Sequence, residues 1–238
     1  MLIGPYVNGT AVVVGGLVGA FLGPRLPERL RTALPQTFGL ASMGLGAMLI
    51  VKVNYMPAVV LALVIGAMLG EMLYVEKGIG RAAGAARTIV DRIFPPREGL
   101  SHEEFLDKFV AIVVLFCASG TGIFGAMHEG MTGDPSILYI KTILDLFTSA
   151  IFATSLGYAV ATIALPQVII QVGLALFAAL ILPMTTKVMM DDFSALGGLI
   201  MLATGLRICG IKMFPVANML PGLLLVMPFS YLWVTYVQ

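Results

Sequence analysis

Few residues of this chain carry charge. Charged residues make up 11% and hydrophobic residues 59% of its 238 residues, and the mean hydropathy is +0.98. Soluble domains usually contain about 25% charged residues, so a soluble chain of this composition would expose large apolar patches. The composition therefore excludes an ordinary soluble domain and predicts a helical bundle in a lipid bilayer. The net charge of +1 gives no indication of a nucleic-acid partner.

Side chains for covalent or metal chemistry are also scarce. The two cysteines, Cys117 and Cys209, lie in apolar runs and fit neither a CxxC motif nor a metal-ligand spacing, so we interpret them as packing residues. His128, Glu129 and Asp134 match no metal-binding motif. The sequence also has no Ser–His arrangement, no paired catalytic carboxylates and no HExxH motif. We therefore expect neither an enzyme nor a bound cofactor or metal.

Long apolar segments, by contrast, dominate the chain and predict its fold. A transmembrane helix needs about 20 apolar residues. Segments 36–51 and 195–210 are the weakest and are candidates for re-entrant or broken helices, so merging one with a neighbour would leave seven spans. We predict an all-α polytopic membrane protein with a single membrane domain over residues 1–238. Its eight candidate spans are residues 6–23, 36–51, 56–73, 109–126, 139–163, 167–186, 195–210 and 214–236.

Lysine and arginine residues predict the orientation of these spans. Most of the 14 basic residues fall on one side of the predicted helices, and the positive-inside rule places that side in the cytoplasm. With eight spans, both termini would then lie outside. The start of the chain lacks the basic region of a cleavable signal peptide, so the first helix is expected to remain. The cytoplasmic set is Arg25, Arg29, Arg31, Lys77, Arg81, Arg87, Arg92, Arg97, Lys108, Arg207 and Lys212, and the outer set is Lys52, Lys141 and Lys187.

The one sizeable polar piece is a connector formed by residues 74–108. Within it, residues 77–94 carry apolar side chains at helical spacing and basic side chains on the other face. Such a helix is typical of a connector that lies on the anionic inner leaflet of a membrane. The alternative interpretation is a docking site for a partner protein.

Glycines recur at intervals of four in two of the spans. Gly15, Gly19 and Gly23 follow this pattern in the first span, and Gly66 and Gly70 follow it in the third. Small residues at this spacing let helices approach closely in lipid. We expect these glycines to pack helices within a subunit or between the subunits of a homo-oligomer. A pore-lining role for the bare backbone is the alternative.

Two sequence registers indicate an internal repeat. The tetrapeptide ALPQ occurs at residues 33–36 and again at 164–167, which implies two parallel halves. A second register aligns residues 39–57 with residues 197–215 and implies inverted halves. Because the two registers cannot share one symmetry operation, the form of the repeat stays open. Transporters often carry such repeats.

The best candidate for a functional site is a pair of charges in the fifth span. Lys141 and Asp145 are the only charged residues between Asp134 and Lys187, and their i, i+4 spacing places them on one face of a helix. Lys141 can extend to the outer interface, whereas Asp145 lies about 9 Å inside the span. Asp145 must therefore pair, take up a proton or face water. Either the two residues form a structural ion pair, or Asp145 is a titrating proton or cation site, or it is exposed at a helix end.

Four further polar residues are candidates for lining a solute pathway. Gln171 lies deep in the sixth span and shares a face with Gln167. Asn8, near the outer end of the first span, is either a helix cap or part of a polar path. Asn218 precedes a proline that can kink the eighth span. Glu71 ends the third span at the cytoplasmic edge, where we expect it to be solvated.

Two outer segments also give expectations that the structure can test. The glycine-rich stretch 119–136 is expected to be a flexible loop or an unwound backbone that offers polar groups to a solute. Asp191 and Asp192 are expected in a solvated turn beside Lys187.

Four segments carry a family resemblance, and in chain order they read NGTAVVVGGLVG (8–19), LVIGAMLGE (63–71), KTILDLFTSAIFATSLG (141–157) and VANMLPGLL (216–224). They resemble the uncharacterised bacterial integral-membrane family typified by YqgA (domain of unknown function 554), and the resemblance spans nearly the whole chain. It implies an inner-membrane protein without an established activity. The matching positions point to Asn8, Glu71, Lys141, Asp145, Gln171 and Asn218.

One part of the chain departs from the pattern expected of this family. Where the resemblance implies a glycine–proline–methionine-like turn and an aspartate, the chain has Ser119-Gly120-Thr121 and Glu129. A role for this acidic residue therefore does not follow from the resemblance.

The sequence leaves two functional hypotheses open. The first is a transporter or channel for a small solute or ion in the bacterial inner membrane, proton-coupled through Asp145. The second is a non-transporting scaffold or regulatory protein that acts through the cytoplasmic segment 74–108. In the first hypothesis the partners are the lipid bilayer and the solute or ion.

Overall fold

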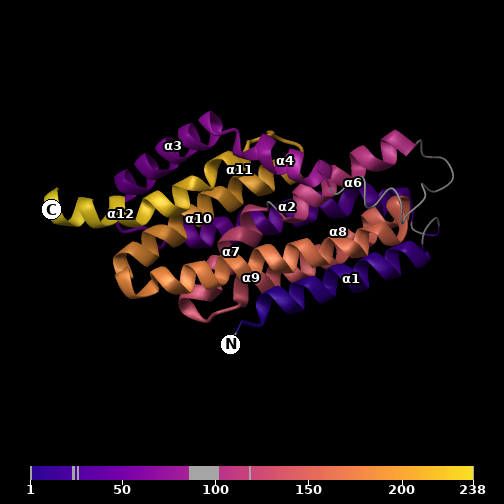
Figure 1. Cartoon of the computed structure of the whole chain (residues 1–238), viewed down its shortest axis with the longest axis horizontal. Helices are drawn as coiled ribbons and strands as arrows, with labels where there is room; N and C mark the ends of the chain where they lie inside the picture. Colours follow the sequence, from indigo (N-terminus) through magenta and orange to yellow (C-terminus); the bar gives the residue numbers. More distant parts are fainter. Residues whose placement is uncertain (1, 23–24, 26, 86–101, 118, 238) are drawn as a thin grey trace. The chain divides into compact units, whose positions relative to one another are not determined.

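The computed structural model describes residues 2–22, 25, 27–85, 102–117 and 119–237, and every regular element in these ranges is helical (Figure 1). The predicted all-α fold is therefore confirmed. The α-helices are α1 (Gly4–Leu22), α2 (Glu28–Ile50), α3 (Met56–Met72), α4 (Val75–Ala85), α6 (His102–Cys117), α7 (Gly120–Thr132), α8 (Ser136–Leu156), α9 (Ala164–Ile181), α10 (Lys187–Ile208), α11 (Val216–Met219) and α12 (Pro221–Tyr236). The 3-10 helices are η2 (Gly157–Ile163) and η3 (Leu182–Met184).

Five helical segments in the described ranges are long and apolar enough to cross a membrane, and the bent pair α3 and α4 makes a sixth if it counts as one span. The sequence predicts seven or eight. Part of the difference is α2, whose apolar part Gln36–Ile50 is shorter than the other candidate spans. The rest lies in Ser136–Met184, where 49 residues form one candidate segment. A straight helix of that length would extend about 73 Å, more than twice the bilayer core.

This long segment contains two helices, α8 and α9, that lie side by side. Asp145 of α8 accepts a hydrogen bond from Gln167 of α9, so the chain must reverse between them. The reversal begins at Gly157, whose φ of 66° is a conformation that favours glycine. With 21 and 18 residues, α8 and α9 are each close to the length of a single span.

The chain forms two compact units. Unit 1 contains Met1–Pro35 and Gly78–Ala178, and unit 2 contains Gln36–Lys77 and Ala179–Gln238. Helices α2, α4 and α9 therefore each contribute residues to both units. The single membrane domain inferred from the sequence stays a prediction.

In unit 1, α1 packs closely along α8 (Figure 1). A Cβ atom added at Gly15 would collide with the carbonyl oxygen of Leu146, and one added at Gly19 would collide with that of Ala150. The predicted glycine face of α1 thus lies directly against the α8 backbone. The third glycine of the pattern, Gly23, lies outside the described residues.

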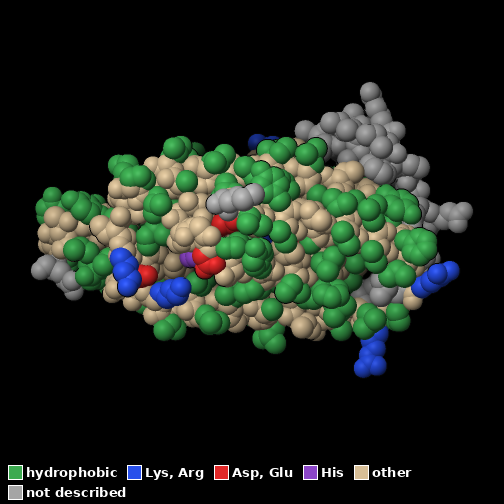
Figure 2. Space-filling view, turned by 90° about the horizontal axis from the view of Figure 1, so that it is seen from below, with side chains coloured by type: hydrophobic (Ala, Val, Ile, Leu, Met, Phe, Trp, Pro, Cys, Tyr) green, Lys and Arg blue, Asp and Glu red, His purple; other side chains and the backbone are tan. Residues whose placement is uncertain are grey.

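The opposite face of α1 carries large apolar side chains that are exposed, including Val14, Leu17, Val18 and Phe21. Small residues inside and large apolar residues outside are the arrangement expected of a helix surrounded by lipid. Figure 2 shows the same character more widely, since hydrophobic side chains cover much of the face it views and charged side chains occur in a few places.

The apolar core of unit 1 is formed by α6 against α1, α8 and η2. Phenylalanines at four-residue and seven-residue intervals on α6 face this core, and Phe105 and Phe109 stack with ring centroids 6.4 Å apart. The cluster comprises Val12, Ala20, Phe105, Leu106, Phe109, Ile112, Val113, Phe116, Ala153, Leu156, Ala159, Val160, Ile163 and Ala164.

In unit 2, glycines again allow close helix contact. A Cβ at Gly66 would collide with the backbone nitrogen of Gly222 on α12, and one at Gly70 would collide with the carbonyl oxygen of Asn218 on α11. Gly39 meets Gly205 of α10 in the same way. The predicted packing glycines of α3 therefore lie at contacts inside the unit.

The expectation of a loop or unwound backbone over residues 119–136 is wrong for most of that stretch. Residues Gly120 to Thr132 form α7, which ends at Gly133 with a φ of 75°. Its glycines serve close packing: a Cβ at Gly130 would collide with the carbonyl oxygen of Ala175 on α9. Tertiary contact thus overrides the low helix propensity of glycine.

The amphipathic connector is described in part. Its first section forms α4, which ends at Ala85, and the α6 helix begins at His102. The section between them, which includes Arg87 and Arg92 of the predicted basic face, lies outside the described residues.

Candidate functional site

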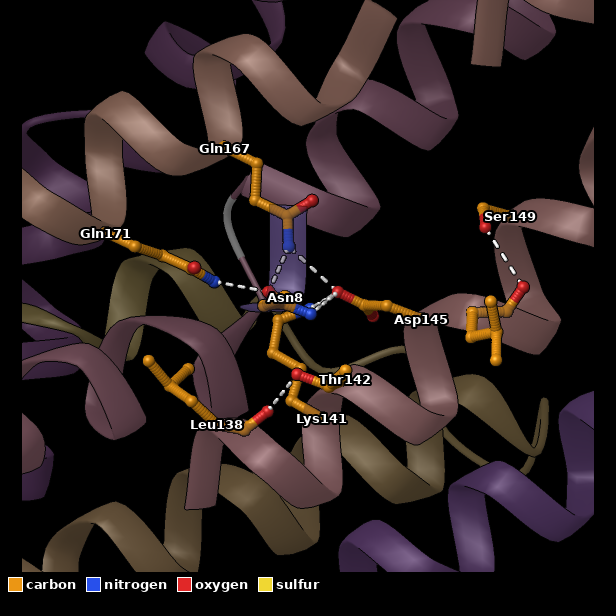
Figure 3. A network of polar contacts seen from close by, with 9 residues as sticks. Asn8, Leu138, Lys141, Thr142, Asp145, Ser149, Gln167 and Gln171 are labelled. Atoms are coloured by element: carbon orange, nitrogen blue, oxygen red, sulfur yellow. Dashed lines mark hydrogen bonds and ion pairs between the residues drawn. The ribbon is translucent and has the colours of Figure 1, made fainter. Parts of the chain in front are cut away.

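Five buried polar side chains from three helices meet in unit 1, and we call them the polar cluster (Figure 3). Asn8 comes from α1, Lys141 and Asp145 from α8, and Gln167 and Gln171 from α9. None of the five exposes more than 7% of its surface. The glycine contacts that bring α1 against α8 hold Asn8 close to the two charges.

One carboxylate oxygen is the centre of the cluster. Asp145 Oδ2 accepts hydrogen bonds from Lys141 Nζ at 2.5 Å, Asn8 Nδ2 at 2.9 Å and Gln167 Nε2 at 2.8 Å. A buried charge is tolerated when it is both paired and hydrogen-bonded. The predicted ion pair therefore exists, and the expectation that Lys141 extends to the interface is wrong, because its ammonium group turns inward to the carboxylate.

The negative charge on Asp145 also fixes the orientation of the three amides. Asn8 presents its NH2 group to the carboxylate, so its Oδ1 faces α9 and accepts from Gln167 Nε2 and from Gln171 Nε2, the latter at 2.8 Å. Both glutamines thus use their NH2 groups inward. Their Oε1 atoms are buried and have no hydrogen-bond partner in the part of the chain that the structure describes.

Phe116, which the sequence analysis did not single out, and Gly122 of the glycine-rich stretch shape the space around Lys141. The Phe116 ring centroid lies 5.6 Å from Lys141 Nζ, which is within the range of a cation–π contact. At Gly122 on α7, an added Cβ would lie 2.6 Å from Lys141 Cε and 3.4 Å from Gln171 Nε2. Gly122 therefore leaves room for both side chains.

A second buried carboxylate lies one helical turn away along α1. Glu129 of α7 is 1% exposed, and its Oε1 accepts from the backbone N–H groups of Ile3 at 2.8 Å and Gly4 at 3.0 Å. Glu129 thus satisfies free donors at the start of α1, where negative charge is also favoured by the helix dipole. The described residues contain no group of three His, Cys, Asp or Glu side chains able to hold a metal.

The remaining two predicted pathway residues belong to unit 2 and do not join the polar cluster. Asn218 Nδ2 donates to Glu71 Oε2 at 2.5 Å, and Asn218 Oδ1 accepts from the backbone N–H of Glu76 at 2.8 Å. Glu76 in turn pairs with Arg207 at 2.7 Å. These contacts tie the bend between α3 and α4 to α10 and α11, and Glu71 is exposed as expected.

The expectation of a solvated turn is wrong for Asp192. Its side chain is completely buried and accepts from the backbone N–H groups of Asn54 at 2.8 Å and Tyr55 at 3.0 Å and from Ser230 Oγ at 2.6 Å. Asp192 therefore anchors the start of α3, as Glu129 anchors the start of α1. Asp192 lies near the start of α10, and nothing in the sequence around it indicated that the start of α3 would pack over this side chain.

The polar cluster is suited to holding positive charge. It offers one carboxylate and three amide oxygens, two of them without a donor among the described residues, and the neighbouring Phe116 ring adds an aromatic face. Gln167 was noted in the sequence only as the neighbour of Gln171. The i, i+4 spacing of Gln167 and Gln171 was the signal that could have identified Gln167 as a site residue, because this spacing places both amides on the face of α9 that contacts α1.

Comparison with known proteins places the chain in a family. It matches the family model described as a protein of unknown function (DUF554) over residues 3–231. It is 58% identical over 236 residues to the uncharacterized protein YqgA of Escherichia coli K12, with 99% of each chain covered. It is 26% identical over 228 residues to the uncharacterized membrane protein YdfK of Bacillus subtilis 168, covering 94% of this chain and 93% of that one. No solved structure matches. This membrane protein therefore belongs to the DUF554 family.

Proposed function

We propose that the protein moves a small solute or ion across the bacterial inner membrane and that Asp145 changes its charge partner during this movement. The observation that carries the proposal is the buried ion pair of Lys141 and Asp145. Ionisable side chains inside a membrane are expensive and commonly mark ion, proton or substrate pathways.

The pair has the composition of a site that can change state. Asp145 accepts three hydrogen bonds from the described residues on one oxygen, Oδ2, and the Lys141 ammonium group that donates one of them sits at the end of a long flexible side chain. A proton on Asp145, or a competing cation, would weaken the attraction that holds the ammonium group. The neighbouring amides would then offer their other polar atoms.

The titratable groups near Asp145 are few. Lys141 lies on its own helix, and the Cys117 thiol on α6 is close enough to interact with both charges. The side chains that face the carboxylate from α1 and α9 are the amides of Asn8 and Gln167, which do not titrate. Proton coupling through this cluster therefore depends chiefly on Asp145 and Lys141.

The proposal is tested with the full chain in liposomes that contain a pH-sensitive dye. A potassium gradient with valinomycin sets the membrane potential, and the luminal pH is followed. We expect the wild-type protein to raise the proton flux above that of empty liposomes and Asp145→Asn to remove the increase. Asp134→Asn is the matched control, because Asp134 is an exposed acid just before α8. An Asp145→Asn protein with unchanged flux and pH dependence would contradict proton coupling.

Other parts of the assignment also stay proposals. The cytoplasmic side of segment 74–108 rests on the distribution of basic residues, and a homo-oligomer rests on the glycine faces, which the described contacts already use within each unit. The scaffold hypothesis depends on segment 74–108, of which residues 86–101 lie outside the described part of the chain. Deleting 86–101 would abolish a scaffold function and would leave transport in outline.

A further inference from the structure

The Lys141 ammonium group occupies a site built for a cation. It is 3% exposed, lies 2.5 Å from Asp145 Oδ2 and lies 5.6 Å from the Phe116 ring centroid. A carboxylate and an aromatic face are the groups that recognise ammonium ions in proteins. The cation that the structure shows there is covalently part of α8, four residues before the carboxylate it contacts.

The site also has more acceptors than its own donors can satisfy. Gln167 Oε1 and Gln171 Oε1 are buried without a hydrogen-bond partner among the described residues. Turning either amide over does not solve this, because an oxygen would then face Asn8 Oδ1 and, for Gln167, also Asp145 Oδ2. A buried acceptor without a donor costs free energy, so both atoms favour a guest that carries N–H groups or positive charge.

We propose that the polar cluster binds a small monovalent cation of the ammonium class and that Lys141 is its tethered competitor. One cation replaces another at Asp145, so the net charge of the buried site does not change during the exchange. The lysine stem packs against Gly122, where an added Cβ would lie 2.6 Å from Lys141 Cε, so the glycine makes room for the tethered cation. This inference rests on the proposed function only where it concerns transport, because cation binding can be measured at equilibrium without any transport.

The test removes the tethered cation and measures binding of free ones. The full chain carrying Lys141→Met is purified in detergent, and thermal unfolding is followed by the fluorescence of Trp233, the one tryptophan of the chain. Ammonium, methylammonium, sodium, potassium and choline chlorides are compared at equal ionic strength. We expect ammonium and methylammonium at tenfold excess over Kd to raise the Tm by about 3 °C relative to choline. The wild-type protein should show a smaller shift, because Lys141 competes.

Two further variants decide whether the whole site or only a bare carboxylate is responsible. The double variant Lys141→Met with Asp145→Asn should lose the response. Adding Gln171→Leu to Lys141→Met should weaken it at least threefold in apparent Kd. A response equal for choline and ammonium, or one untouched by Gln171→Leu, would overturn the inference. A response strongest for sodium or potassium would overturn the ammonium class.

The design also separates this inference from the proposed function. If Lys141→Met does not yield folded protein, Lys141→Gln replaces it, since the amide still donates to Asp145. Binding without any flux in liposomes would contradict transport and support the cation site. Flux with no cation-specific binding would contradict the cation site and leave transport standing.

Discussion

At the residue scale, the buried negative charge of Asp145 is compensated by the donors of the polar cluster. Asp145 Oδ2 accepts three hydrogen bonds, and one of the donors carries a full positive charge. Removing one partner of a buried pair leaves the other charge uncompensated, which is more damaging than removing both. The cluster is therefore expected to respond asymmetrically to substitutions of its two charged members.

Lys141→Met should lower the free energy of unfolding by about 3–5 kcal/mol, because it leaves the Asp145 carboxylate buried with amide donors only. Adding Asp145→Asn should recover part of this loss, since no charge then remains in the cluster. Thermal and denaturant unfolding in detergent measure both effects. Lys52→Met is the control, as Lys52 is exposed in the turn before α3, and it should change stability by less than about 0.5 kcal/mol. A double variant less stable than Lys141→Met would argue against charge burial as the cause.

Glu129 gives a contrasting case, because in the described part of the chain one of its two oxygens accepts both hydrogen bonds. Glu129→Ala should destabilise by about 1–3 kcal/mol, since two backbone N–H groups at the start of α1 would lose their acceptor. Glu129→Gln should cost much less, because Gln Oε1 can accept both bonds and the other carboxylate oxygen has no donor to lose among the described residues. Unfolding midpoints of the two variants make the comparison. Equal losses would mean that the negative charge at the helix start, rather than the acceptor, is what stabilises α1.

Sequence reasoning succeeded at this scale where the interaction was local. The i, i+4 spacing was sufficient to predict the contact of Lys141 with Asp145, because both side chains lie on one helix. It could not predict that Asn8 and Gln167 would donate to the same oxygen, since that depends on how three helices pack. It also grouped Glu71 and Asn218 with the cluster, although both belong to the other compact unit.

At the element scale, glycine decides how closely the helices approach. The pattern on α1 correctly indicated a packing face, and the structure supplies its partner, the α8 backbone at Leu146 and Ala150. The same residue type misled the analysis of residues 120–132, because glycine in a soluble context favours loops. In lipid, the backbone must be satisfied within its own helix, and small residues are retained where helices touch.

Gly19→Ala should destabilise the protein by about 1–3 kcal/mol, because the new Cβ would collide with the carbonyl oxygen of Ala150 and push α1 away from α8. Gly173→Ala on α9 is the matched control, since an added Cβ there meets nothing within 4 Å. That substitution should be neutral or stabilising by up to about 1 kcal/mol, because alanine is the better helix former. Both are measured by thermal unfolding. If the two variants lost equal stability, close contact of α1 with α8 would not be the reason for Gly19.

At the scale of the whole molecule, composition was the most reliable guide. A chain with 59% hydrophobic residues folds with large apolar side chains outside and with glycines, amides and an ion pair inside. The sequence separated α8 from α9 as two spans, but hydropathy gave the number of spans only approximately, because apolar segments as short as Gln36–Ile50 cannot be assigned by length. The direction in which the chain crosses the membrane rests on the basic residues, and that can be tested separately.

Helix α3 offers the sharpest test of orientation, because Lys52 lies before it and Lys77 follows it by a few residues. If α3 crosses the bilayer, the two positions lie on opposite sides, and the basic residues of the connector place Lys77 in the cytoplasm. Cys117 and Cys209 are first replaced by serine, and a single cysteine is introduced as Lys52→Cys or Lys77→Cys. In intact spheroplasts, a membrane-impermeant maleimide should label only the Lys52→Cys protein, and permeabilised cells should label both. Labelling of both proteins from outside would show that α3, whose 17 residues are short for a span, turns back instead of crossing.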